Sequence, residues 1–241
     1  MNNEPSAPFG WDTPIRHDEA TIQSMVASAI SSAYVWMTLA LGLTGLVAYE
    51  ISTHSEWLVA LLGWPMLVLF FAELALVWIV GACIHKLSFG AAAFLLALYS
   101  AINGVTLFPI FVAYTQESIV TTFLITGATF GAMALIGHST KANLSSLGGF
   151  LFMGLIGLII AGVVNIFMHS SALQWIISIA GVLIFVGLTA YDAQKIRVQI
   201  EAAASSGQVD LRKISLIGSL ELYLDFINLF LYLLRLTGRR R

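Results

Sequence analysis

Three polar residues interrupt an apolar stretch near the end of the 241-residue chain, in the sequence SLELYLDFINLF. Glu221, Asp225 and Asn228 follow one another at intervals of four and three residues, which places them on one face of a helix. Carboxylates can hold protons or hard cations, but a carboxylate at the centre of a membrane helix costs about 2.5 to 3.5 kcal/mol. Acids in such a helix therefore indicate a position away from lipid.

The polar face of this helix is longer than the three residues. At about 100° per residue, six residues form a stripe within one third of the helix circumference. The opposite faces of the helix consist of Leu, Ile and Phe. The stripe consists of Gly218, Glu221, Asp225, Asn228, Tyr232 and Arg235. We expect other helices to enclose this one, with the stripe lining a cavity or pathway. The alternative is that the stripe only satisfies buried polar groups on neighbouring helices.

A second acid could complete a proton-binding pair. Asp192 occurs in GLTAYDAQKIR, near the end of another apolar segment. If it meets Asp225, two like charges in a low dielectric share a proton, and they repel when that proton is lost. The pair would be a pH-dependent latch, and its oxygens suit Ca²⁺. Asp192 could instead pair with Lys195 or Arg197 at the membrane surface.

One more acid lies inside an apolar segment, in FFAELALVW. Glu73 could form a buried ion pair with Arg235 and so tie two helices together.

Composition sets the class of protein in which these acids lie. Hydrophobic residues make up 59% of the chain and charged residues 10%, against about 25% charged in soluble domains, so the sequence predicts an all-α polytopic membrane protein. The net charge of -2 gives no support for a nucleic-acid partner. The single cysteine, Cys83, excludes an intrachain disulfide and a thiolate metal site.

Apolar stretches of about 20 residues, the length that crosses a bilayer, predict seven transmembrane helices. The expected spans are 33–51, 57–84, a span within 87–116, 119–136, 147–168, 173–196 and 214–236. Gly104 and Pro109 should break or kink the third span. Gly127 and Gly131 form a GxxxG pair that predicts close helix packing on the fourth.

Lys and Arg in the short loops predict the orientation. They follow the second, fourth and sixth spans, whereas the alternate loops have none, which places the N-terminus in the cytoplasm. Residues 1–28 are expected to be a flexible cytoplasmic tail, 29–238 the membrane domain and 239–241 a basic tail. The basic ending RLTGRRR would then lie outside, unless the last span is re-entrant.

The sequence resembles the Bax inhibitor (transmembrane Bax inhibitor motif) family, in its bacterial inner-membrane branch. The resemblance covers 31–238 and is carried by LYLDFINLFLYLLRL, AYDAQKIR, NGVTLFPI and the acid in FFAELALVW. It implies seven helices with the last one central and enclosed by the other six, and a pH-sensitive Ca²⁺ leak. It also implies that Asp192 and Asp225 are the paired acids, and that Glu73 and Arg235 match a second conserved acid and base.

Two departures from the family pattern affect these expectations. Some relatives have arginines where the second span ends, but this chain has Ile84, His85 and Lys86 there. The loop expected over 199–211 is also long, so the geometry between the two aspartates could differ.

Other functions are weighed against the same residues. An intramembrane aspartyl protease would have a Tyr-Asp pair like Tyr191 and Asp192, but the Gly-x-Gly-Asp signature is missing before Asp225. No metal or serine-protease motif is present either, so we expect no enzyme and no cofactor. Ca²⁺ is the expected permeant species, and the expected partners are the lipid bilayer, Ca²⁺ and protons. The main alternative is a non-conducting regulator that binds a membrane-bound protease or other membrane proteins. A proton-coupled transporter is the third possibility.

Overall fold

The computed structural model describes residues 19–61, 63–83, 88–206 and 210–241. Within these ranges the regular structure consists of helices, with one isolated bridge between Tyr114 and Arg240, so the all-α prediction is confirmed. The helices are α1 (Glu19–Thr53), α2 (Ser55–Leu61), α3 (Trp64–Cys83), α4 (Phe89–Ala113), α5 (Gln116–Ser139), α6 (Ser145–Met168), α7 (Ser171–Ser206) and α8 (Leu211–Thr237).

Length and composition make this a multi-pass membrane protein. Six of the described helices, α1 and α4 to α8, are long and apolar enough to cross a bilayer, and α3 adds a shorter apolar segment over Trp64–Ile79. Large apolar side chains such as Trp78 and Phe167, each 79% exposed, point away from the bundle. In water such exposure would be unfavourable, whereas it matches a surface covered by lipid.

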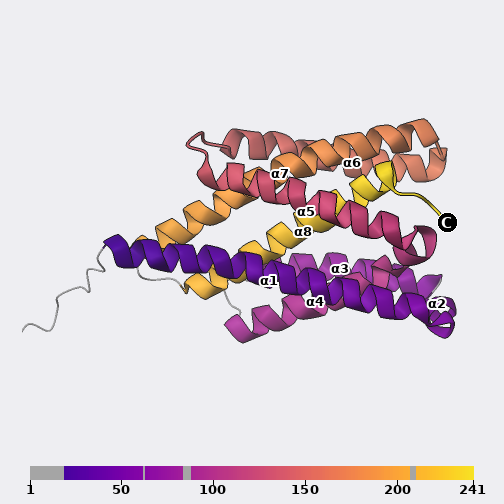
Figure 1. Ribbon diagram of the computed structural model, residues 1–241, viewed down its shortest axis with the longest axis horizontal. Helices are drawn as coiled ribbons and strands as arrows, with labels where there is room; N and C mark the ends of the chain where they lie inside the picture. Colours follow the sequence, from indigo (N-terminus) through magenta and orange to yellow (C-terminus); the bar gives the residue numbers. More distant parts are fainter. Residues whose placement is uncertain (1–18, 62, 84–87, 207–209) are drawn as a thin grey trace, which may run out of the picture.

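The last helix is the most buried one. In its most apolar window 67% of α8 is buried, against 11% to 33% of the other five long spans. It runs between a group formed by α1, α3 and α4 and a second group formed by α5, α6 and α7 (Figure 1). It packs extensively against α1, α4, α5 and α7, while α3 packs on α4 and α6 on α7. Extensive contact with α8 therefore comes from four of the six helices expected to enclose it.

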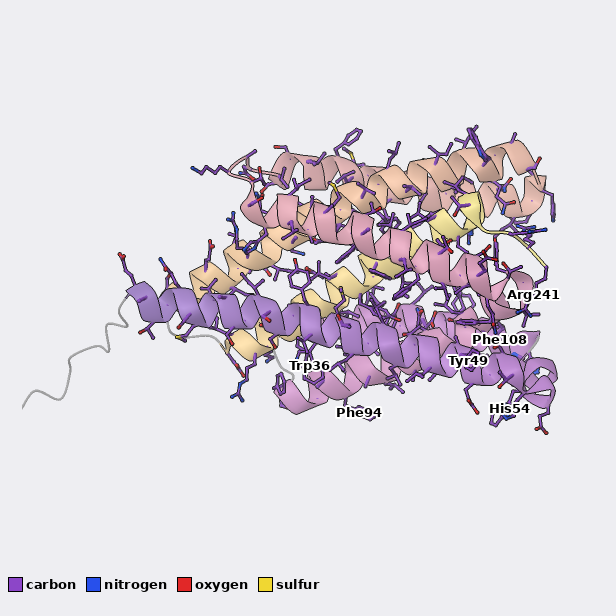
Figure 2. The ribbon with its side chains drawn as sticks, in the orientation of Figure 1. Trp36, Tyr49, His54, Phe94, Phe108 and Arg241 are labelled. Carbon is purple, nitrogen blue, oxygen red and sulfur yellow. The ribbon has the colours of Figure 1, made fainter. Side chains whose placement is uncertain are left out.

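The C-terminus lies at the opposite end of the bundle from the start of α1. The helix α8 is continuous from Leu211 to Thr237, and Figure 2 shows Arg241 at the same end as His54, which follows α1. The re-entrant alternative for the last span is therefore wrong. The basic tail is held in place, because the Thr115 N–H donates to the Arg239 carbonyl (3.1 Å) and the Arg241 N–H to the Ala113 carbonyl (3.0 Å).

The first helix begins earlier than expected. It starts at Glu19, inside the segment 1–28 expected to be flexible, and an acid in the first turn complements the helix dipole. The Ser215 hydroxyl donates to the Ala29 carbonyl at 2.7 Å, which fixes this extension of α1 against α8. Residues 1–18 lie outside the described residues.

The second expected span is divided in two. Hydropathy is continuous over 57–84, but the chain turns at Gly63, whose φ of 90° favours glycine, between α2 and α3. Pro65 then lies in the first turn of α3, where proline is tolerated because its missing N–H has no helical partner. Residues 84–86, where relatives have arginines, lie outside the described residues.

The sixth span also continues further than expected. The helix α7 extends to Ser206, so most of the loop expected over 199–211 is helical. The following helix begins after Asp210, whose side chain caps it by accepting from the Arg212 N–H at 3.0 Å. This correction leaves the connection between the two aspartate-bearing helices short.

A different glycine of α5 makes the close helix contact predicted for Gly127 and Gly131. Nothing lies within 4 Å of a Cβ added at either of these two, so the packing role predicted for them is wrong. At Gly137 an added Cβ would instead overlap the backbone carbonyl of Ala190 in α7. The crossing of α5 and α7 therefore requires glycine at 137, two residues from Asp192 along the partner helix.

The motif NGVTLFPI does not break the third span. Pro109 lies inside α4, which continues to Ala113, so the expected break is wrong. A Cβ at Gly104 would lie 2.7 Å from the Thr44 carbonyl of α1, so this glycine permits α1 and α4 to approach each other.

Candidate functional site

The acid at the middle of α8 lies against α7. Asp225 is 4% exposed, and its neighbour is Asp192, close enough for one carboxyl group to hydrogen-bond to the other when one of them carries a proton. The Asp225 Oδ2 atom is buried and has no hydrogen-bond partner. The structure thus brings together the two aspartates that the resemblance implies are paired, with Asp225 buried and the Asp192 side chain 14% exposed.

A lysine joins this pair to the third acid of the region. The Lys195 ammonium lies 2.6 Å from Glu221 Oε1 and 3.7 Å from Asp192 Oδ1. The Glu221 Oε2 atom, in contrast, is buried without a partner. Three carboxyl groups and one ammonium therefore form one cluster between α7 and α8, and the cluster is negative unless it also holds protons or a cation.

The cluster lies toward the membrane boundary. At about 1.5 Å per residue, Asp192 is roughly 30 Å along α7 from Ser171, which is about the thickness of the hydrocarbon core. The remainder of α7 extends beyond that distance, beside the start of α8. A proton or cation at Asp192 would therefore have a short route to one membrane face and a long route to the other.

The polar stripe of α8 is packed against α7. Glu221 and Asp225 meet α7 in the cluster, and further along the stripe the ring of Tyr232 stacks on Phe185 with centroids 5.8 Å apart. At Asn228 the side-chain amide donates to the Leu224 carbonyl of its own helix at 2.8 Å. Much of the stripe thus lies at the interface with α7, but this interface does not satisfy all of its buried polar groups, because Glu221 Oε2 and Asp225 Oδ2 have no hydrogen-bond partner.

The expected ion pair between Glu73 and Arg235 is not formed, so that prediction is wrong. Among the described residues, Glu73 accepts a hydrogen bond of 2.7 Å from the Thr106 hydroxyl of α4. Arg235 is exposed, and its guanidinium carbon lies 5.5 Å from the centre of the Tyr232 ring. The two residues lie on α3 and α8, and α3 packs on α4 instead.

Metal-site geometry does not go beyond the aspartate pair. Among the described residues, no group of three or more His, Cys, Asp or Glu side chains is arranged to hold a metal ion. The third acid of the cluster, Glu221, is instead held by the Lys195 ammonium, 2.6 Å from its Oε1 atom. Binding of a cation at Asp192 and Asp225 therefore remains a prediction.

Comparison with known proteins is consistent with this arrangement. The family described as "Inhibitor of apoptosis-promoting Bax1" matches residues 26–241. The chain belongs to the Bax inhibitor family. It is similar to the inner membrane protein YbhL of Escherichia coli K12, with 46% identity over 214 residues, 88% of this chain and 92% of the relative. It is also similar to uncharacterized proteins of Borreliella burgdorferi (41% identity over 88% of this chain and 92% of the relative) and Deinococcus radiodurans (38% over 89% and 92%).

The Bax inhibitor family match includes every residue of the cluster and all helices except the first residues of α1. One member of the site was nevertheless missed as a site residue. Lys195 follows Asp192 by one helical turn and was considered only as a surface partner, although it also reaches Glu221. Tyr223, between the two acids of α8 in sequence, lies outside the cluster, because it is fully buried and contacts the Thr44 hydroxyl of α1 at 2.7 Å.

Proposed function

We propose that this Bax inhibitor family member is a pH-sensitive calcium leak channel of the bacterial inner membrane, with no enzymatic activity. The observation that supports it is the burial of Asp225 beside Asp192, in a cluster with more carboxyl groups than cations. Two buried carboxylates are stable together when they share a proton. Loss of that proton would make them repel and would separate α7 from α8.

The arrangement proposed around the pair has seven crossings, with α3 as the seventh and α8 at the centre. The N-terminus is proposed to be cytoplasmic, because Lys141, Lys195, Arg197 and Arg212 all lie toward the end of the bundle where α1 begins. The pair would then be close to the cytoplasmic face and would respond to the pH of the cytoplasm.

Flux through liposomes tests this proposal. Purified protein in liposomes that contain a calcium-sensitive dye should pass Ca²⁺, with a rate that changes with pH. The variants Asp225→Asn and Asp192→Asn should each lose most of that pH response, because an amide cannot release the shared proton. The control is Glu50→Gln, which removes an exposed acid at the far end of α1.

The same measurement separates the alternatives. Flux that equals that of protein-free liposomes at every pH would overturn the proposal and would favour a non-conducting regulator of membrane proteins. A pH response that survives in both aspartate variants would show that another group is the sensor.

A further inference from the structure

A second polar cluster lies inside the bundle, between α3 and α4. Glu73 of α3 accepts the 2.7 Å hydrogen bond from the Thr106 hydroxyl, which also lies 3.0 Å from the Asn103 carbonyl. One turn earlier on α4, the Asn103 side-chain amide donates to the Tyr99 hydroxyl at 3.5 Å. These residues are separate from the aspartate pair, which α7 and α8 form.

One atom of this cluster has an unmet hydrogen-bonding requirement. Asn103 is 7% exposed, and its Oδ1 atom is buried without any hydrogen-bond partner. A buried polar group left unsatisfied costs about 1 to 3 kcal/mol, so native structures pair such atoms with protein, water or an ion. The Oδ1 atom therefore indicates a ligand that the protein itself does not supply.

The charge of the cluster also lacks compensation. No ion pair with Glu73 is found among the described residues, and Arg235 lies on Tyr232 instead. A carboxylate near the middle of a membrane helix is expensive unless a proton or a cation neutralises it. A proton on Glu73 would remove the charge but would leave the separate requirement of Asn103 Oδ1 unmet, whereas a cation would answer both.

We propose that Glu73, Asn103 and the hydroxyl groups of Thr106 and Tyr99 form a binding site for a hard metal cation of the calcium class. Carboxylate, amide carbonyl and hydroxyl oxygens are the ligands such ions take, with water in the remaining positions. Thr106 Oγ1 and Tyr99 Oη keep lone pairs free while they hydrogen-bond as described. This site does not depend on the flux proposed above, since it shares no residue with Asp192 and Asp225.

Terbium luminescence tests the site directly. Tb³⁺ takes the oxygen ligands of Ca²⁺, and its emission is excited by energy transfer from nearby aromatic rings, here Tyr99 and Tyr223, whose ring centres are 5.8 Å apart. The full chain in lipid nanodiscs should show saturable Tb³⁺ emission that Ca²⁺ displaces. Glu73→Gln and Asn103→Leu should each weaken binding by at least about tenfold.

Two further variants keep the test decisive. Asn103→Asp retains the oxygen and adds a charge, so it should bind Tb³⁺ at least as tightly as the parent even if Asn103→Leu folds poorly. Glu50→Gln, which removes an exposed acid of α1 outside both clusters, should leave this emission unchanged. Absence of saturable emission, or equal emission in the parent and Glu73→Gln, would overturn the proposal and would leave a proton as the only neutralising species.

Discussion

The variant Gly137→Ala is expected to be less stable than the parent protein by about 3 kcal/mol or more. The added methyl group would overlap the backbone carbonyl of Ala190, and backbone cannot move aside as a flexible side chain can. The helices α5 and α7 would have to separate at their crossing. Because Asp192 follows Ala190 by two residues, this separation would also shift the aspartate pair.

The matched control for this prediction is on the same helix. A Cβ at Gly127 meets nothing within 4 Å, so Gly127→Ala should be neutral or stabilising by up to about 1 kcal/mol, since alanine is the better helix former. Unfolding of both variants by a denaturing detergent, followed by circular dichroism, measures the difference. Equal stability of the two variants would contradict the close crossing at Gly137.

Replacement of Lys195 by methionine is expected to destabilise the protein by about 1 to 3 kcal/mol at neutral pH. The substitution removes the ammonium that lies 2.6 Å from Glu221 and 3.7 Å from Asp192, and it leaves both carboxylates without a cation. This expected loss of stability is smaller than for a fully buried ion pair, because the Lys195 and Glu221 side chains are 32% and 30% exposed. The cost should decrease as the pH falls, because protonated acids need no counter-charge.

Two comparisons make the lysine prediction specific. The double variant Lys195→Met with Glu221→Leu removes both charges and should recover part of the lost stability. Lys141→Met, at an exposed lysine in the turn between α5 and α6, should change stability little at any pH. Thermal unfolding in detergent, at neutral and at acidic pH, measures the stability of the parent protein and of the three variants. A pH-independent loss in Lys195→Met would mean that packing of the lysine stem, not its charge, supports the cluster.

The sequence allowed the helices to be predicted better than their ends and contacts. Apolar length identified the six described helices that are long and apolar enough to cross a bilayer, because a bilayer imposes that length on each helix. Hydropathy carries no information about backbone conformation, however, so the turn at Gly63 inside a continuous apolar segment was missed. The starts and ends of α1 and α7 were missed for a related reason, since helix outside the membrane needs no apolar run.

Contacts between helices were less predictable than the helices themselves. The family resemblance implied that Asp192 and Asp225 are paired, whereas the residues alone also allowed Asp192 to pair with Lys195 or Arg197. The structure places Asp192 beside both Asp225 and Lys195. The partner of Glu73 was predicted wrongly. Either an arginine or a hydroxyl group can be the partner of a buried carboxylate, and the sequence does not say which helix lies next to Glu73. Likewise, several glycines occur on α5, and only the rotation of the helix decides that Gly137 faces α7.

The burial of α8 has a consequence for how the protein is made. The most buried helix leaves the ribosome after the five other helices that are long enough to cross a bilayer, so these must enter the membrane before the helix that α1, α4, α5 and α7 pack against exists. Until α8 is made, α7 presents Asp192 and Lys195 to lipid or to the insertion machinery without Glu221 and Asp225. A chain that terminates before Leu211 would keep the 3.7 Å pair of Asp192 with Lys195 but would lack the 2.6 Å contact of Lys195 with Glu221, so we expect membrane quality control to degrade it.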